Sequence, residues 1–226
     1  MNTKWLLTGG AIVFTTALLF SGASRADVLT FSLTSDHCSG NCLTGQSSGG
    51  TITVTDISGG VTVDVTLANG NKFVNTGQET DFGFNLTNTP LITYSGITTG
   101  FSVTPGTGTV GQTQNGTGNF HDDGTGFFEY GVSCTGCGNG GSAPLTGPLD
   151  FTITGTGLTA ASFTTNAAGQ FFVVDMISGT TGKTGPVDAS KVGAVPGPIA
   201  GAGLPGLIAA CGGLLALARR RRQKLA

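Results

Sequence analysis

Apolar residues alternate with threonine along the first half of the chain, with a period of two. The apolar positions are Phe31 and Leu33, Ile52 and Val54, and then Val61, Val63, Val65 and Leu67. Threonines at 51, 53, 55, 62 and 66 occupy the positions between them. This period predicts strands with one buried and one exposed face, and the β-branched threonine suits an exposed pleated surface.

Glycine and asparagine separate these strands, and more apolar runs follow them. Ser58-Gly59-Gly60 and Asn69-Gly70 predict hairpin turns, because Gly and Asn accept positive φ. Further strands are expected at Asp81–Thr87, Leu91–Tyr94, Phe127–Val132, Leu149–Thr154 and Phe171–Ile177, with shorter pieces near Lys72–Asn75 and Phe101–Thr104. No long segment has helical periodicity. We therefore predict an all-β fold: a single antiparallel β-sandwich, jelly-roll-like or Ig-like, over residues 27–184, followed by a linker at 185–194.

The first 26 residues have the pattern of a secretory signal peptide. Lys4 provides the positive start, and Trp5–Phe20 is an uncharged apolar run. Small residues at the positions before Ala26 predict cleavage after that residue. The alternative is a retained N-terminal anchor, which we favour less because polar, strand-forming sequence follows the short apolar run at once.

A second apolar segment lies near the other end of the chain. Residues 199–218 are uncharged and long enough to cross a bilayer, and the basic residues 219–224 follow directly. The arginines of this stop-transfer signal are Arg219, Arg220, Arg221 and Arg222. Positive charge beside a span holds that side in the cytoplasm, so the C-terminus is expected inside and the β domain outside.

The tail from 195 to 226 resembles a known sorting signal. Val195, Pro196, Gly197 and Pro198, then the apolar span, then the arginine cluster, are similar to the three parts of the PEP-CTERM sorting domain. The usual motif has Glu between the prolines, where this chain has Gly197. The resemblance implies an exosortase-like membrane enzyme as partner, which cleaves near the proline motif and releases or transfers the protein. The alternative is a simple membrane anchor.

The charge of the chain is divided between its middle and its ends. All 12 acidic residues lie in the middle part, against three lysines (Lys72, Lys183 and Lys191), which gives a formal charge of −9 there and −2 for the whole chain. An acidic domain repels phosphate backbones, so we expect no nucleic-acid partner.

Four of the five cysteines belong to the exported part: Cys38, Cys42, Cys134 and Cys137. In an oxidising compartment an even set predicts disulfides, with three connectivities open: two local bridges or either crossed pairing. A four-cysteine zinc site has plausible spacing but is less favoured, because thiols outside the cytoplasm are usually oxidised.

The densest polar cluster is His121-Asp122-Asp123, with Glu129 shortly after it. Asp122, Asp123 and Glu129 are candidate cation ligands or a general base, but the spacing matches no calcium loop. We favour a turn before the next strand, because Asp-Asp-Gly is good turn chemistry. Two histidines and two glutamates offer few catalytic sets, so we expect no enzyme and no cofactor.

These observations lead to one main hypothesis and two alternatives. The main one is an exported, non-enzymatic surface or extracellular-matrix protein, held in the inner membrane before its tail is processed. Association with exopolysaccharide or biofilm is implied by the family resemblance alone. The first alternative is a membrane-anchored adhesin or glycan-binding module, and the second is a periplasmic hydrolase.

Overall fold

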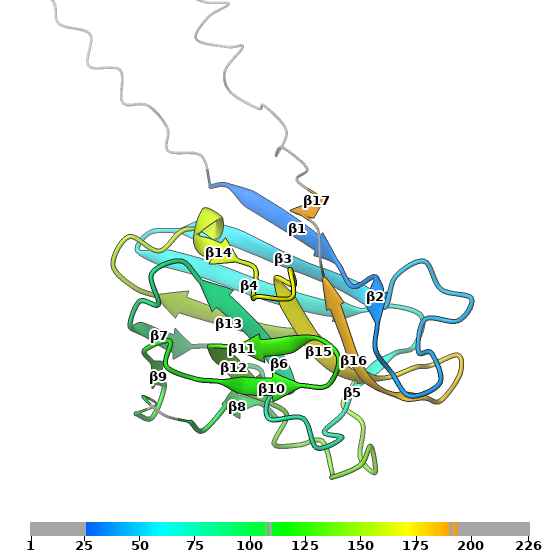
Figure 1. The fold of residues 1–226 in the computed structure, drawn as a ribbon. Coiled ribbons are helices and arrows are strands. Elements are labelled where there is room, and N and C mark those ends of the chain that lie inside the picture. The colour runs from blue at the N-terminus through cyan, green and yellow to red at the C-terminus, as the bar shows by residue number, and fades with distance from the viewer. Residues whose placement is uncertain (1–25, 107, 109, 190–191, 194–226) are drawn as a thin grey trace, which may run out of the picture.

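The computed structural model describes residues 26–106, 108, 110–189 and 192–193. Within these residues the chain forms two antiparallel sheets and a separate hairpin (Figure 1). The first sheet has the spatial order β17 (Val192–Gly193), β1 (Val28–Ser32), β3 (Gly50–Ile57), β4 (Gly60–Leu67), β13 (Leu149–Thr154), β7 (Ile92–Ser95) and β9 (Thr113–Gln114). The all-β prediction is confirmed, and each strand pairing within these sheets is antiparallel.

The second sheet carries most of the polar groups discussed below. Its spatial order is β2 (Ser35–Asp36), β16 (Thr184–Ala189), β15 (Phe172–Ile177), β6 (Phe82–Leu86), β12 (Tyr130–Ser133) and β8 (Ser102–Val103). Two further short strands extend it: β5 (Lys72–Phe73) pairs with β15, and β14 (Phe163–Thr164) pairs with β6. The separate hairpin consists of β10 (Phe120–Asp122) and β11 (Gly126–Phe128).

The alternating pattern predicted the buried face of the first sheet. Val61, Val63 and Val65 are at most 1% exposed, and the threonines between and opposite them point away from the core. Thr55 lies opposite Thr62, and Thr51 opposite Thr66, so threonines form cross-strand pairs on the outer face. Burying one face of each strand holds this register, because a slip by one residue would expose the valines.

Aromatic rings from both sheets fill the space between them. Phe31 of β1 contacts Phe172 of β15 with ring centroids 4.7 Å apart, and Phe82 of β6 contacts Phe151 of β13 at 5.7 Å. Phe84 stacks on Tyr130 at 5.3 Å within the second sheet. Such ring pairs add to the free energy gained from burial, so this aromatic layer holds the two sheets together.

Two local expectations, about one turn and one strand, need correction. Asn69-Gly70 does form a turn with positive φ, but it leads from β4 in the first sheet to β5 in the second, so it is not a hairpin. The single strand expected at Phe127–Val132 is divided at Glu129, because β11 pairs with β10 while β12 pairs with β6 and β8. A sequence pattern shows which residues suit a strand but not which partner each part will find.

The expected linker at 185–194 instead contains β16 and β17. β16 is an inner strand of the second sheet, in which Val187 and Ala189 face the core. Gly185 and Pro186 resemble linker composition, yet a side chain at Gly185 would come within 2.8 Å of the Cys38 backbone. The small residues therefore serve close packing, and the apolar pattern is too sparse to reveal the strand.

Two targeting predictions fall outside this part of the chain. Residues 1–25 of the expected signal peptide, and the expected tail with Val195, Pro196, Gly197, Pro198 and Arg219–Arg222, lie outside the described residues. Within the residues that the structure describes, no helix has the length and apolarity needed to span a bilayer.

Candidate functional site

The β10–β11 hairpin packs on the outer face of the second sheet and forms a third layer (Figure 1). Gly83, Val173 and Asp188 lie side by side on that face, because Val173 pairs with Gly83 on one side and with Asp188 on the other. Phe128 of the hairpin is fully buried over this row, and a Cβ at Gly83 would come within 2.9 Å of its ring and of Val173. The glycine therefore makes room for the hairpin.

Four aspartates are buried between or beside these two layers, and we call them the acidic layer. Asp175 and Asp188 occupy the outward positions of β15 and β16, whose other alternate residues face the core. Asp81 directly precedes β6, and Asp122 ends β10. Each is at most 2% exposed. Aspartate is rarely buried without a partner, so the contacts of each carboxylate decide what the layer can do.

Asp175 and Asp81 are partly satisfied by hydrogen bonds from the chain. The Asp175 carboxylate accepts bonds from the backbone N–H of Thr76 at 2.6 Å and from its hydroxyl at 2.7 and 2.8 Å. Asp81 Oδ2 accepts a bond from the backbone N–H of Cys134 at 2.6 Å. Burial nevertheless raises the pKa of Asp175 to about 6 and that of Asp81 to about 7, because desolvation outweighs these donors.

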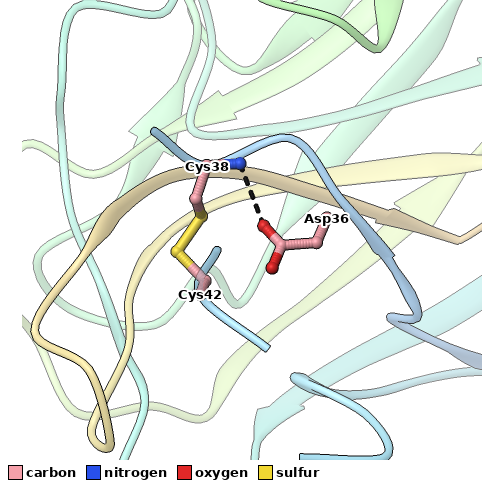
Figure 2. A group of neighbouring side chains, drawn as sticks. All are labelled: Asp36, Cys38 and Cys42. Atoms are coloured by element: carbon pink, nitrogen blue, oxygen red, sulfur yellow. Dashed lines mark hydrogen bonds between the residues drawn. A yellow bond between two sulfur atoms is a disulfide. The ribbon is translucent and has the colours of Figure 1, made fainter. Parts of the chain in front are cut away.

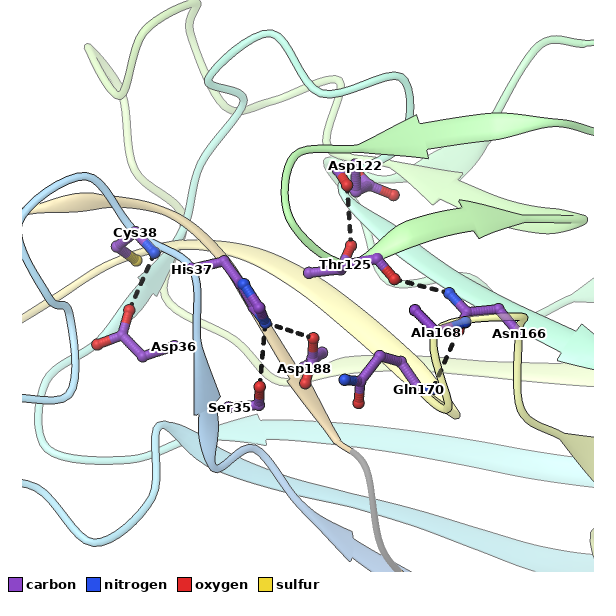
Figure 3. A network of polar contacts seen from close by, with 10 residues as sticks. All are labelled: Ser35, Asp36, His37, Cys38, Asp122, Thr125, Asn166, Ala168, Gln170 and Asp188. Atoms are coloured by element: carbon purple, nitrogen blue, oxygen red, sulfur yellow. Dashed lines mark hydrogen bonds and ion pairs between the residues drawn. The ribbon is translucent and has the colours of Figure 1, made fainter.

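Asp122 differs from the other three in that its carboxylate has no partner. Both of its oxygens are buried without a hydrogen bond, and the residue is 0% exposed. Thr125 donates to the backbone carbonyl of Asp122, not to its side chain (Figure 3). Burial raises the pKa of Asp122 to about 8, helped by the nearby charges of Asp175 and Asp81 and, more weakly, Glu79 and Asp123.

His37 joins the acidic layer to the strand at its edge. Its Nε2 lies 3.0 Å from Asp188 Oδ2 and 3.0 Å from the hydroxyl of Ser35, as Figure 3 shows. Burial raises the pKa of Asp188, although the Ser35 hydroxyl and His37 oppose that shift. The other ring nitrogen faces the hairpin turn, because a Cβ at Gly124 would lie 2.7 Å from Nδ1.

Serine, histidine and aspartate in contact raise the question of nucleophilic catalysis. In a catalytic triad the serine and the aspartate bind opposite nitrogens of the imidazole, so that the base is oriented from one side and acts on the other. Here Ser35 and Asp188 approach the same nitrogen of His37. With both groups on one nitrogen, the aspartate does not orient the imidazole from the side opposite the serine, as it does in a triad. The contacts instead join β2 to β16.

The structure separates the three cation candidates taken from the sequence. Asp122 is buried, while the side chain of Asp123 is 78% exposed and lies 3.7 Å from His121. Glu129 is half-buried beyond the end of β11, and its pKa is raised by burial. Asp122 instead shares its burial with Asp81 and Asp175, whose charges help to raise its pKa. Asp175 left a sequence signal, since it interrupts the apolar run Phe171–Ile177 with a charge.

The cysteines form the two local bridges. Cys38 is bonded to Cys42, and Cys134 to Cys137. The Asp36 carboxylate lies against the first bridge and accepts a bond from the N–H of Cys38 at 3.0 Å (Figure 2). It also accepts a bond from the N–H of Leu43 at 2.7 Å. Asp36 and the two sulfurs are as close as cation ligands would be. Both sulfurs are consumed by the disulfide, so this group acts as a loop staple.

Comparison with known proteins identifies no relative. No family model matches the chain, and no curated protein and no solved structure matches it either.

Proposed function

We propose that this chain is an exported, non-enzymatic surface or extracellular-matrix protein. Its β domain is followed by a C-terminal sorting tail, which is removed by cleavage. The tail keeps the protein at the inner membrane until an exosortase-like membrane enzyme cleaves near Val195–Pro198. The tail motif also suggests association with exopolysaccharide, because that is the setting of the family it resembles. The fold is consistent with this role, since antiparallel sheets are common in extracellular domains.

The observation that carries the proposal is the position of the domain ends. β1 begins at Val28, just after the expected cleavage point at Ala26, and β17 ends at Gly193, just before Val195. β17 pairs with β1, so that Gly193 lies opposite Thr30 at one edge of the first sheet. Processing at both expected points would therefore leave every strand of the domain intact.

We assign the two sheets to the sandwich class, jelly-roll-like or Ig-like. Support comes from the aromatic layer between them, in which Phe82 and Phe151 meet from opposite sheets. The Cys38–Cys42 and Cys134–Cys137 bridges suit an oxidising compartment outside the cytoplasm. A non-enzymatic role fits the burial of the acidic layer, because its four carboxylates are sealed from a dissolved substrate.

The intact mass of the protein recovered from the exporting cells tests this proposal. We expect a species that lacks residues 1–26 and everything beyond about Val195. A matched pair of variants locates the signal: Pro196→Ala should leave the tail attached, whereas Pro205→Ala, inside the apolar span, should still be processed. A mature protein that retains Arg219–Arg222 in the unaltered chain would exclude sorting by cleavage and leave a simple anchor.

One exposed ring favours the glycan-binding alternative. Phe127 of β11 is 51% exposed, and its centroid lies 4.8 Å from that of His121. The backbone N–H of His121 donates to the carboxylate of Glu79, which places a polar group at the strand that carries the His121 ring. A ring next to polar groups is a common platform for sugars. Pull-down with the exopolysaccharide of the same cells should retain the unaltered protein and lose Phe127→Ala; equal retention of both would contradict this alternative.

A further inference from the structure

The turn between β6 and β7 and the loop between β13 and β14 border a cavity of about 300 Å³. The loop includes a single turn of 3-10 helix, η1 (Ala160–Ser162). The turn lines the cavity with Thr87, Asn88 and Pro90, and the loop lines it with residues that include Thr156, Leu158 and Ala161. Small-molecule sites have volumes of about 300–1,000 Å³, so a cavity of this size fits one compact ligand.

Hydrogen bonds hold the two sides of the cavity in place. The backbone N–H of Thr87 donates to the carbonyl of Ser162 at 2.8 Å and joins the turn to the loop. The Tyr130 hydroxyl, from the second sheet, donates to the carbonyl of Pro90 at 2.6 Å. The first residue of η1 donates its backbone N–H to the carboxylate of Asp56, in the first sheet, at 2.5 Å. A site formed in advance in this way loses little conformational entropy when a ligand binds.

The backbone of the turn has an unusual conformation. Asn88 and Thr89 follow each other with φ of 63° and 42°, in a region that a β-branched residue such as threonine rarely adopts. The side chain of Thr89 packs toward Gly116, where an added Cβ would lie 2.6 Å from the Cβ of Thr89. Asn88 lines the cavity. Strained residues persist where the surroundings fix them, and they gather at ligand sites.

The polar groups that line the cavity are uncharged. None of its lining residues is acidic or basic, and the described part of the chain forms no hydrogen bond with the side chain of Thr87, Asn88 or Thr156. Pro90 and Leu158 add apolar surface, and Leu158 is buried. Hydroxyl and amide groups beside an apolar wall match a sugar ring, whose hydroxyls form hydrogen bonds and whose C–H groups pack against apolar side chains. A charged ligand would lose hydration here without gaining a counter-charge.

We propose that this cavity binds one uncharged sugar ring. Thr87, Asn88 and Thr156 form hydrogen bonds with its hydroxyls, and Pro90 and Leu158 pack against its C–H groups. The site is distinct from the exposed hairpin ring of the glycan-binding alternative. It is also independent of the sorting of the tail.

The test uses the full-length chain in a detergent without a sugar head group. The neutral probes are the methyl glycosides of D-glucose, D-galactose and D-mannose. Titration followed by saturation-transfer NMR should show millimolar binding of at least one of them. Glucuronic acid and glucosamine, which are charged, should bind more weakly by about 10-fold or more.

A matched pair of variants locates the site. Asn88→Gly removes the amide and keeps the turn, because glycine accepts positive φ, so it should weaken binding by about 3- to 10-fold. The control is Asn41→Gly, since Asn41 also has a positive φ, of 61°, but is exposed and does not line the cavity. This control should bind the sugar as the unaltered chain does.

A third variant fills the cavity. Ala161 lines it and is exposed, so Ala161→Trp adds a large ring there with little effect on the core. This change removes no side-chain hydrogen bond, yet it should abolish binding. The midpoint of thermal unfolding shows whether each variant folds.

Four results would overturn the proposal. The first is an absence of binding of all three glycosides to the unaltered chain. The second is binding by folded Ala161→Trp equal to that of the unaltered chain. The third is loss of binding in Phe127→Ala but not in Asn88→Gly, which would place the sugar on the hairpin. The fourth is equal weakening by Asn88→Gly and Asn41→Gly. If Ala161→Trp does not fold, the comparison of the two asparagine variants decides.

Discussion

Thr76 binds Asp175 through both its backbone N–H and its hydroxyl, and so holds a carboxylate that burial would otherwise leave unsatisfied. The two residues are far apart in sequence and belong to different segments, the chain after β5 and the middle of β15. Their contact holds one carboxylate of the acidic layer, that of Asp175, in place. It also means that one hydroxyl supports a buried charge.

Thr76→Val should therefore destabilise the fold. The change keeps the shape of the side chain but leaves a buried acceptor short of a donor, which costs about 1–3 kcal/mol. The measurement is the free energy of unfolding in denaturant. Thr51→Val is the control, since Thr51 is exposed on the outer face of the first sheet and should change that free energy by less than about 0.5 kcal/mol. Equal effects of the two variants would show that the Thr76 hydroxyl has no special role.

The free energy of unfolding should fall as the pH rises. The pKa values of Asp175, Asp81 and Asp122 in the folded state are about 6, 7 and 8, all above the ordinary value of 3.8. Between these limits the unfolded chain has released protons that the folded chain retains, so the free energy of unfolding decreases with pH. The contribution of these groups to that free energy should be highest below about pH 4. It should decline most steeply between about pH 4 and 6, where all three hold a proton only in the folded chain, and then more gradually up to about pH 8.

Unfolding in denaturant at several pH values measures this decline. Asp122→Asn should flatten the part nearest pH 8, because it removes the group with the highest of the three pKa values. Asp27→Asn, at an exposed position before β1, should leave the decline between pH 6 and 8 in place. A free energy of unfolding that rises over this range would contradict the assigned burial of the carboxylates.

Neighbouring phenylalanines of the hairpin should respond very differently to truncation. Phe128→Ala removes a fully buried ring that lies over Gly83 and should cost about 3–5 kcal/mol of unfolding free energy. Phe127→Ala removes a ring that is 51% exposed and should cost much less. Thermal and denaturant unfolding of the two variants provide the comparison. Similar losses would mean that the hairpin does not cover the sheet as the structure has it.

The disulfides should be formed in the protein recovered from cells and should stabilise it modestly. Alkylation without reductant should label none of Cys38, Cys42, Cys134 and Cys137. Replacing both cysteines of one bridge by alanine should cost about 2 kcal/mol, because so short a loop loses little entropy when it is closed. Mass spectrometry after alkylation and unfolding in denaturant check the two parts. Labelling of these four residues would exclude the bridges.

Much of the fold could be predicted from local pattern. The alternation at Val61, Val63 and Val65 depends on which side chains avoid water, and that preference is independent of the partner strand. The strand expected at Leu149–Thr154 has the bounds that the structure gives β13. β16 was missed because its apolar positions are few and Gly185 and Pro186 suggest a linker. The division at Glu129 was missed because pairing is decided by distant segments.

The sequence by itself determined an all-β domain, acidic and rich in cysteine pairs, between two segments with the character of export signals. It also named Asp122, but with Asp123 and Glu129, its neighbours in the chain. Only the tertiary structure decided that Asp122 is buried while Asp123 is exposed, and that the bridges are local. The physical reason is that alternation reports the burial of each residue, whereas a site depends on which distant residues the packing of layers brings together.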